Sequence, residues 1–409
     1  MHFENIIKTT LGIKDHRIVK MDGGTENIII HLDVIKRRKL PCGQCGKRAK
    51  VVDRVRNERT FLHVPLWGIA VFLRYWPRRV NCPDCGTRRE QLPWADGKEQ
   101  ITKQLAVTIA VWAKILAVDV VAKMFGVHWN TVYGAVRKAV AYGLAHRELG
   151  TILYIGIDEI SRKKGHKYIT QVYDLERKRL LWNGKDRKEE TLRAFFEAHG
   201  EQLRTTVVGV CCDMWAPYIK VIREYLPDAV LVFDRFHLMS HLLDAVDTVR
   251  KDEARDLKKT NPDLLKGTKY VFLKNPENLT DKQRERLSCV EKLNLRINRA
   301  YLLKEEFKEL FRYRSRAWAE KFLNRWTRRV MYSRLKPLKK FVRTLRRHWE
   351  GVLAWVTVPI SNGAVEGMNN NAKAISHRAR GFSSYETFAC MLMHCMADLP
   401  TQELSHSFV

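Results

Sequence analysis

The sequence predicts a multidomain protein of the mixed α/β class, and three observations support this prediction. The chain has 409 residues, more than the roughly 100–200 of one ordinary domain. Hydrophobic residues make up 45% of it, as in globular proteins, and no apolar run reaches the roughly 18 residues of a membrane span. Strand-like and helix-like patterns occupy separate blocks. We therefore expect several folding units.

The patterns divide the chain into five segments. Residues 1–96 alternate apolar and polar residues in short strand-like stretches, whereas 97–148 show the apolar spacing of helices. In 149–239, three strand patterns precede the order helix, strand, helix, strand, which predicts a mixed five-stranded sheet. Residues 240–357 are helical and densely basic. Residues 358–409 open with a proline and a Ser-Asn cap signal before a predicted helix.

The charge balance indicates a polyanionic partner. Seventy-four Lys and Arg against 45 Asp and Glu give a net charge of +29, spread along the whole chain. Nucleic acid is the usual partner of such a surface, because each neutralised phosphate releases condensed counterions. A membrane surface is the alternative, but neither an amphipathic anchor nor a lipidation motif is evident. We expect nucleic acid as the partner and no membrane.

Two C-x-x-C pairs predict a zinc site. Cys42 and Cys45 lie in PCGQCG, and Cys82 and Cys85 in NCPDCG. A two-residue spacer lets both thiolates point at one tetrahedral ion, and a second pair completes a structural site. The N-terminus, MHFENIIKTTLG, has no signal-peptide pattern, so we expect a cytoplasmic protein, where metal ligation is favoured over disulfides or unrelated thiols. The 36 residues between the pairs predict a large insert.

The segment VDVVAKMFGVHWNTVYGAVRKAV matches the spacing of a helix-turn-helix. A short helix ends near Phe125, Gly126 gives the turn, and a second helix starts around His128. A plain helical hairpin is the alternative, and the charge and the neighbouring zinc site favour DNA binding. The residues expected to face a DNA groove or its phosphates are His128, Trp129, Asn130, Thr131, Arg137 and Lys138.

Three acidic residues stand where strand and helix patterns place them for chemistry. Asp158 ends the first predicted strand, YIGID, and Asp213 ends the fourth, VVGVCCD. If these strands are parallel neighbours, both carboxylates emerge at one edge of the sheet. Glu366 lies about one turn into the helix that Ser361 and Asn362 open. For a single acid, a solvated turn residue is the alternative.

Three such carboxylates suit two Mg²⁺ (or Mn²⁺) ions about 3.5–4 Å apart, which predicts phosphodiester transfer. One ion generates the nucleophile and the other stabilises the leaving oxygen. The predicted helix also carries a polar stripe around Glu366. From this helix we expect Asn369, Lys373 and Arg378 to contact DNA.

Together these residues resemble the ISL-three family of bacterial insertion-sequence transposases along nearly the whole chain. The resemblance rests on the cysteine pairs, VAKMFGVHWNTVYGAV, GIDE, CCDMW, FDRFH and, most specifically, SNGAVEGMNNNAK. It implies a zinc ribbon (1–96), a helix-turn-helix domain (97–148) and a ribonuclease H-like catalytic core (149–239 and 358–409) interrupted by an all-helical insertion (240–357). It further implies that Asp158, Asp213 and Glu366 form the DDE triad that cuts and joins DNA.

The sequence FDRFH resembles the acid-x-x-His motif of other transposases that carry a helical insertion. Asp234 ends the fifth predicted strand and rivals Asp213 as a metal ligand, whereas His237 is a candidate for phosphate contact or proton transfer. The alternative is a capping aspartate and a core histidine. The Arg and Trp residues of the insertion are candidates for binding DNA or for forming a dimer interface.

Three functions compete at this point. The first is an active transposase, a homodimer on double-stranded DNA, associated with the bacterial nucleoid when bound. The second is a DNA-binding regulator derived from such an enzyme and no longer catalytic, which the presence of all the acids disfavours. The third is a ribonuclease H-like structure-selective nuclease, which would not need two separate DNA-locating modules.

Overall fold

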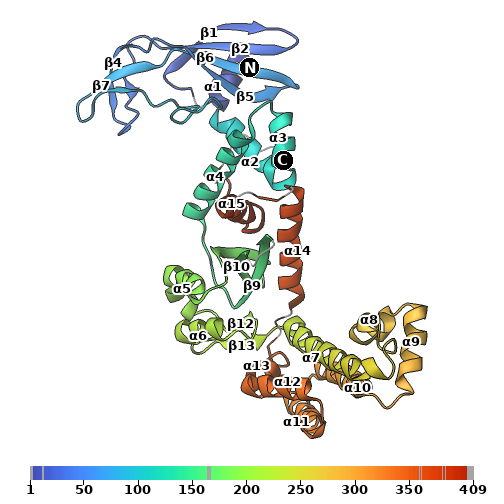
Figure 1. Cartoon of the computed structure of the whole chain (residues 1–409). Coiled ribbons are helices and arrows are strands. Elements are labelled where there is room, and N and C mark those ends of the chain that lie inside the picture. The colour runs from blue at the N-terminus through green and yellow to red at the C-terminus, as the bar shows by residue number, and fades with distance from the viewer. Residues whose placement is uncertain are drawn as a thin grey trace. The chain divides into compact units, whose positions relative to one another are not determined.

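The computed structural model describes residues 3–11, 13–163, 167–358, 360, 362–379, 381–382 and 384–402. The chain forms two compact units, Met1–Glu148 with Ile375–Val409, and Leu149–Ala374. Each unit is described by itself below (Figure 1). Among the described helices, none is both long and apolar enough to cross a membrane.

The first unit begins with helix α1 (Phe3–Thr10) and two four-stranded sheets. The first sheet has the order β1 (His16–Gly23), β2 (Asn27–Val34), β6 (Ile69–Tyr75), β5 (Arg59–Leu66). Its core includes the fully buried rings of Phe61, Tyr75 and Trp94. The second sheet has the order β3 (Leu40–Pro41), β4 (Arg48–Arg54), β7 (Arg78–Cys82), β8 (Gly86–Arg89). The long gap between the cysteine pairs thus holds two strands of the other sheet, β5 and β6.

Helices complete the first unit. They are α2 (Lys103–Ile115), α3 (Val118–Met124), α4 (Trp129–His146) and α15 (Tyr385–Met396). Gly126 has φ +62°, which a residue without a side chain adopts readily, and it separates α3 from α4 as the sequence predicted. Helix α15 packs against α4 and α2 through buried residues such as Phe388 and Leu392. The chain from Ile375 therefore groups with these helices, whereas the family resemblance assigned all of 358–409 to the same domain as 149–239.

The second unit contains the mixed five-stranded sheet that the sequence predicted. Its order is β11 (Arg179–Lys185), β10 (Lys167–Asp174), β9 (Tyr154–Lys163), β12 (Gly209–Cys212), β13 (Val230–Phe233). The first three strands are antiparallel, and β9, β12 and β13 are parallel. Helices α5 (Glu189–Arg204) and α6 (Ala216–Tyr225) connect the strands from β11 to β13. The apolar strands β12 and β13 are short and largely buried.

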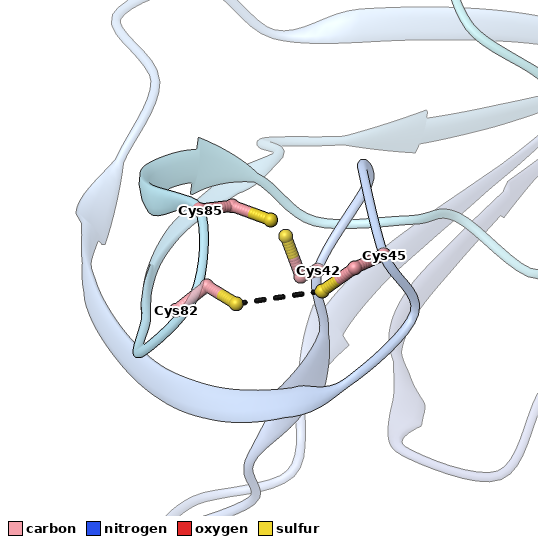
Figure 2. A group of neighbouring side chains, drawn as sticks. All are labelled: Cys42, Cys45, Cys82 and Cys85. Carbon is pink, nitrogen blue, oxygen red and sulfur yellow. Dashed lines mark hydrogen bonds between the residues drawn. The ribbon is translucent and has the colours of Figure 1, made fainter.

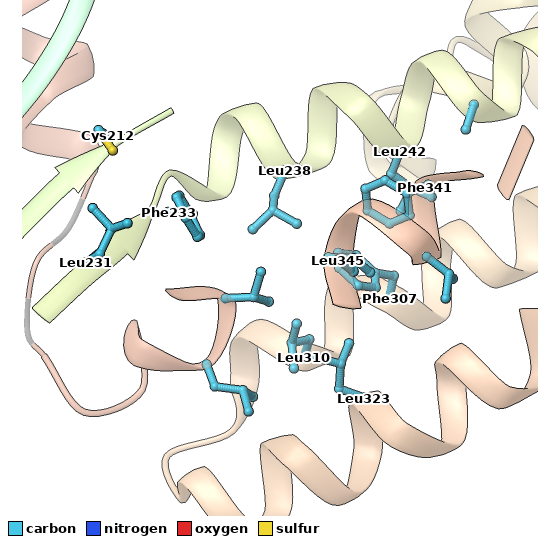
Figure 3. Close-up of a cluster of buried hydrophobic side chains, with 14 of the residues drawn as sticks. Cys212, Leu231, Phe233, Leu238, Leu242, Phe307, Leu310, Leu323, Phe341 and Leu345 are labelled. Carbon is cyan, nitrogen blue, oxygen red and sulfur yellow. The ribbon is translucent and has the colours of Figure 1, made fainter. Parts of the chain in front are cut away.

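A helical block follows the sheet, and residues 235–358, all described, contain no strand. Its helices are α7 (Arg235–Asp256), α8 (Lys269–Leu273), α9 (Asp281–Glu291), α10 (Arg296–Lys308), α11 (Arg316–Tyr332), α12 (Lys336–Arg347) and α13 (Trp349–Ala354). Figure 3 shows one apolar cluster running from Leu231 and Phe233 of the sheet to Phe307 and Phe341 of the helices. The block therefore shares its core with the sheet, and both lie in one compact unit.

Helix α14 (Asn362–Arg378) packs closely on strand β9. A Cβ atom added to Gly156 of β9 would lie 2.8 Å from Val365 Cγ2 of α14 and 2.7 Å from Leu175 Cδ2. Such a contact is too short for any real side chain, so only glycine permits this approach. Ser361, which the sequence places at the start of the helix, lies outside the described residues.

Replacing Gly156 by Ala should destabilise the protein by about 1–3 kcal/mol, since the added methyl group overpacks the contact between α14 and β9. The measurement is the free energy of unfolding from denaturant titration. Gly367→Ala is the matched control on α14 itself, because nothing lies within 4 Å of its added Cβ. That control should be neutral or stabilising. Equal stability of G156A and the parent would contradict the packing.

Candidate functional site

In the second unit, three aspartates lie at the same level along three neighbouring strands. Gly156 of β9 pairs with Cys211 of β12, so Asp158 and Asp213 each lie two residues beyond a paired position. Cys212 pairs with Phe233 of β13, so Asp213 and Asp234 each lie one residue beyond. The first and fourth strands are parallel neighbours, which is the condition under which the sequence places both carboxylates at one edge. Adjacent strands lie roughly 4.8 Å apart, so these carboxylates share one edge of the sheet.

Strand β9 does not end at Asp158, as the sequence pattern suggested, but continues to Lys163. The reason is its antiparallel partner β10, in which Gln171 pairs with Asp158. Only the parallel neighbour stops near this point. Asp158 is therefore held by pairing with β10 on one side, and it lies beyond the last pairing with β12 on the other.

The carboxylate of Asp158 is anchored by a buried amide. Asn369 Nδ2 donates to Asp158 Oδ2 at 2.5 Å, and the backbone N–H of Glu159 donates to Oδ1 at 2.8 Å. The Tyr173 hydroxyl in turn donates to Asn369 Oδ1 at 2.9 Å. Tyr173 and Asn369 are 0% and 9% exposed. The chain Tyr173–Asn369–Asp158 thus joins β10, α14 and β9 through hydrogen bonds away from solvent.

His237 lies between two of the aspartates. Its Nε2 is 3.6 Å from Asp158 Oδ1 and 3.7 Å from Asp234 Oδ2. Asp234 also caps α7, because its Oδ1 accepts the N–H of Phe236 at 2.5 Å. Burial lowers the pKa of His237, but the bond to Asp158 and the charges of Asp213 and Asp234 outweigh it and raise that pKa to about 9. Burial raises the pKa of Asp234 to about 6, against the opposing charge of His237.

Asp213 is engaged by a cation that the sequence did not reveal. An Arg187 guanidinium nitrogen donates to Asp213 Oδ2 at 2.9 Å, and Arg187 Nε forms an ion pair with Glu159 Oε1 at 3.1 Å. The guanidinium also lies 4.7 Å from the ring centroid of Trp215. Burial raises the pKa of Glu159 to about 7, although Arg187 opposes the shift. No spacing signal marks Arg187, whereas Glu159 follows Asp158 directly in GIDE.

Glu366 is exposed on α14 and lies one turn before Asn369. It lines a groove together with Phe236 and Met239 of α7. Within the described residues, only the four cysteines form a group of three or more metal-binding side chains whose ligand atoms lie within 4.8 Å of one another. Among the described residues, Asp158, Asp213, Asp234 and Glu366 therefore do not form such a group.

The DNA-contact candidates of α4 have different surroundings. His128 caps the helix through Nδ1, which accepts the N–H of Asn130 at 3.2 Å. Trp129, Asn130 and Arg137 are exposed, and Thr131 is half-buried. Lys138 forms ion pairs with Asp96 at 3.1 Å and Glu99 at 2.6 Å, so its charge is balanced within the protein.

The three candidates on α14 also differ. Lys373 is exposed. Arg378 donates to the carbonyl oxygens of Lys114 at 2.9 Å and Ile115 at 2.6 Å, which closes the C-terminal end of α2. Asn369, which is buried against Asp158, and Arg378 both make internal hydrogen bonds, and the DNA contacts expected of them from sequence stay a prediction. Side-chain spacing alone does not distinguish these roles.

The four cysteines come together as predicted (Figure 2). Their sulfur atoms lie within 4.8 Å of one another, and Cys45 Sγ is 3.5 Å from Cys82 Sγ. Hydrogen bonds from the backbone N–H groups of Cys45 and Gln44 lower the pKa of Cys42 to about 7. A tetrahedral ion with sulfur at about 2.3 Å needs thiolates roughly 3.8 Å apart. The cluster can therefore hold a structural metal such as zinc.

Comparison with known proteins finds transposases. The family model DDE_Tnp_ISL3, described as Transposase, matches residues 155–392. The transposase of insertion sequence element IS1001 from Bordetella parapertussis is 31% identical over 85% of this chain and 86% of its own length. That of element IS1557 from Mycobacterium tuberculosis is 29% identical over 87% and 85%. The Drosophila P element transposase strand transfer complex gives a TM-score of 0.37 at 11% identity, covering 73% of this chain and 92% of that one. The chain belongs to the ISL3 family of insertion-sequence transposases.

Proposed function

We propose that the protein is an active DDE transposase that binds the terminal inverted repeats of an insertion sequence and catalyses DNA cleavage and strand transfer. The observation that carries this proposal is the placement of Asp158, Asp213 and Asp234 at one edge of the sheet, with the helix that bears Glu366 packed on β9. Asp158, Asp213 and Glu366 are the proposed triad. The whole core is proposed to be ribonuclease H-like.

Mg²⁺ or Mn²⁺ is the proposed catalytic metal, and Asp158, Asp213 and Glu366 would hold it. Carboxylate oxygens are the donors that these hard cations prefer. When bound, the metal supplies positive charge to the phosphate oxygens and activates the attacking oxygen. Arg187 is the internal counter-ion of Asp213, and it would give way if Asp213 held the metal. Asp234 is the alternative to Asp213 as a ligand of this metal.

Other residues at this edge would orient the groups that surround the phosphate. Asn369 keeps Asp158 in one orientation and fixes the turn of α14 that carries Glu366. His237, between Asp158 and Asp234, is placed to contact the scissile phosphate or to move a proton at Nε2. Preorganised groups of this kind avoid the cost of reorientation during the reaction.

The first unit is proposed to recognise the DNA ends. The four-cysteine cluster would bind Zn²⁺ as a zinc ribbon, and α3 and α4 would act as a helix-turn-helix. Trp129, Asn130 and Thr131 are the proposed groove contacts, and Arg137 a phosphate contact, because Lys138 is already paired. A homodimer is proposed, since two transposon ends must be brought together.

Substituting Asp158, Asp213 or Glu366 by Ala should lower Mg²⁺-dependent cleavage of a duplex with the cognate terminal repeat by roughly 100-fold or more. Binding to that duplex without metal should persist. Gel assays of nicking and of retardation measure the two properties. Asp228→Ala, an exposed aspartate of the same unit, is the control. Nicking retained by all three variants would refute the triad, and cleavage of branched DNA regardless of end sequence would favour a structure-selective nuclease.

Asn369→Ala should reduce cleavage by about 5–100-fold, because the buried oxygen of Asp158 loses its donor. Asn369→Asp should be more harmful, since it places a second carboxylate beside Asp158. Tyr173→Phe, which removes the hydroxyl that contacts both Asn369 and Gln171, should be intermediate. The metal concentration for half-maximal cleavage should rise in all three. Asn371→Ala, exposed on the same helix, is the control, and an unchanged metal requirement in N369D would argue against the positioning role.

Removal of zinc should unfold the sheet formed by β3, β4, β7 and β8, and it should abolish binding to the terminal repeat. One zinc ion per chain is expected by mass spectrometry of the purified protein, and Cys45→Ser should reduce that content. Cys289→Ser is the matched control, because this exposed free cysteine lies outside the cluster. Full zinc content in C45S, or its absence from the parent, would contradict the proposed site.

A further inference from the structure

Helix α11 has one buried face and one solvent-exposed face. One face is buried in the core through Phe322, Leu323, Trp326 and other residues. The opposite face is exposed, and its side chains recur at spacings of three and four residues. They are Trp318, Lys321, Arg325, Arg328 and Tyr332, here called the α11 stripe. At 1.5 Å per residue, the stripe extends over roughly 21 Å of helix.

The two ends of the stripe are aromatic rings that face solvent. Trp318 and Tyr332 are 60% and 80% exposed. Lys321 Nζ lies 5.0 Å from the Trp318 ring centroid, and the Arg328 guanidinium lies 5.9 Å from that of Tyr332. Each ring therefore has a cation beside it, and neither ring belongs to the core. Rings exposed to this extent add little to the stability of the helix.

The cations of the stripe also differ from their neighbours on α11. Among the described residues, no carboxylate lies within 4.0 Å of the charged groups of Lys321, Arg325 or Arg328. By contrast, Arg329 forms an ion pair with Glu306 at 2.6 Å. The next helix, α12, has six Lys and Arg in 12 residues and no acid. The positive charge of the stripe is thus left unbalanced.

We propose that the α11 stripe binds a DNA strand with unpaired bases, which stack on Trp318 and Tyr332 while the cations contact phosphates. The unbalanced charge favours a polyanion, and a second copy of the stripe would be repelled because it carries no acid. Base faces are covered in a duplex, so stacking requires unpaired bases. The inference rests on the proposed function, in which cutting the two strands at offset positions would leave such ends.

The test compares binding of the full-length protein, without Mg²⁺, to a blunt terminal-repeat duplex and to the same duplex with a ten-nucleotide single-stranded extension. The parent should prefer the extended duplex. The double variant W318A/Y332A should lose that preference by about 10-fold or more and keep its affinity for the blunt duplex. Fluorescence anisotropy gives both affinities, and thermal melting confirms that the variant is folded.

Two matched controls define the site. Arg329→Ala removes a cation that is already paired, and Tyr270→Ala removes an exposed ring of α8. Both should behave like the parent. An unchanged preference in W318A/Y332A, an equal loss for both duplexes, or a changed oligomeric state with unchanged DNA binding would each overturn the proposal. Because cleavage is not measured, these outcomes are independent of the triad variants.

Discussion

The hydrogen bond from Asn369 to Asp158 connects two parts of the chain that are 211 residues apart in sequence. It joins α14 to β9 at the position where the parallel neighbour of β9 ends. The close approach of Val365 to Gly156 supports the same contact with apolar packing. Because Glu366 lies between these two contacts on α14, its position relative to Asp158 depends on both.

The second constraint at this edge is electrostatic. Several carboxylates, including the largely buried Glu159, lie near one another, which is costly unless cations balance them. Arg187 pairs with Asp213 and Glu159, while His237 lies between Asp158 and Asp234. These two cations allow the acidic residues to stay close to one another. Under the proposed function, metal binding would replace these protein cations with Mg²⁺.

The sequence predicted features that depend on local pattern. The paired cysteines and the helix boundaries around Gly126 follow from residue spacing, and the five-stranded sheet follows from the order of the strand patterns. Contacts between distant residues were not predictable in this way. Arg187 carries no motif, and Arg378 and Asn369 share the helical spacing of surface residues although both make internal hydrogen bonds. The shared core of sheet and helices depends likewise on packing that spacing does not encode.

The most direct test of the central claim is a crystal structure of the full chain with Mn²⁺, located by its anomalous signal. The account predicts manganese bound by Asp158, Asp213 and Glu366, with Asn369 still donating to Asp158 and with Arg187 released from Asp213. Manganese bound away from Asp158, or a metal-bound state in which the Asn369–Asp158 hydrogen bond is broken, would contradict it.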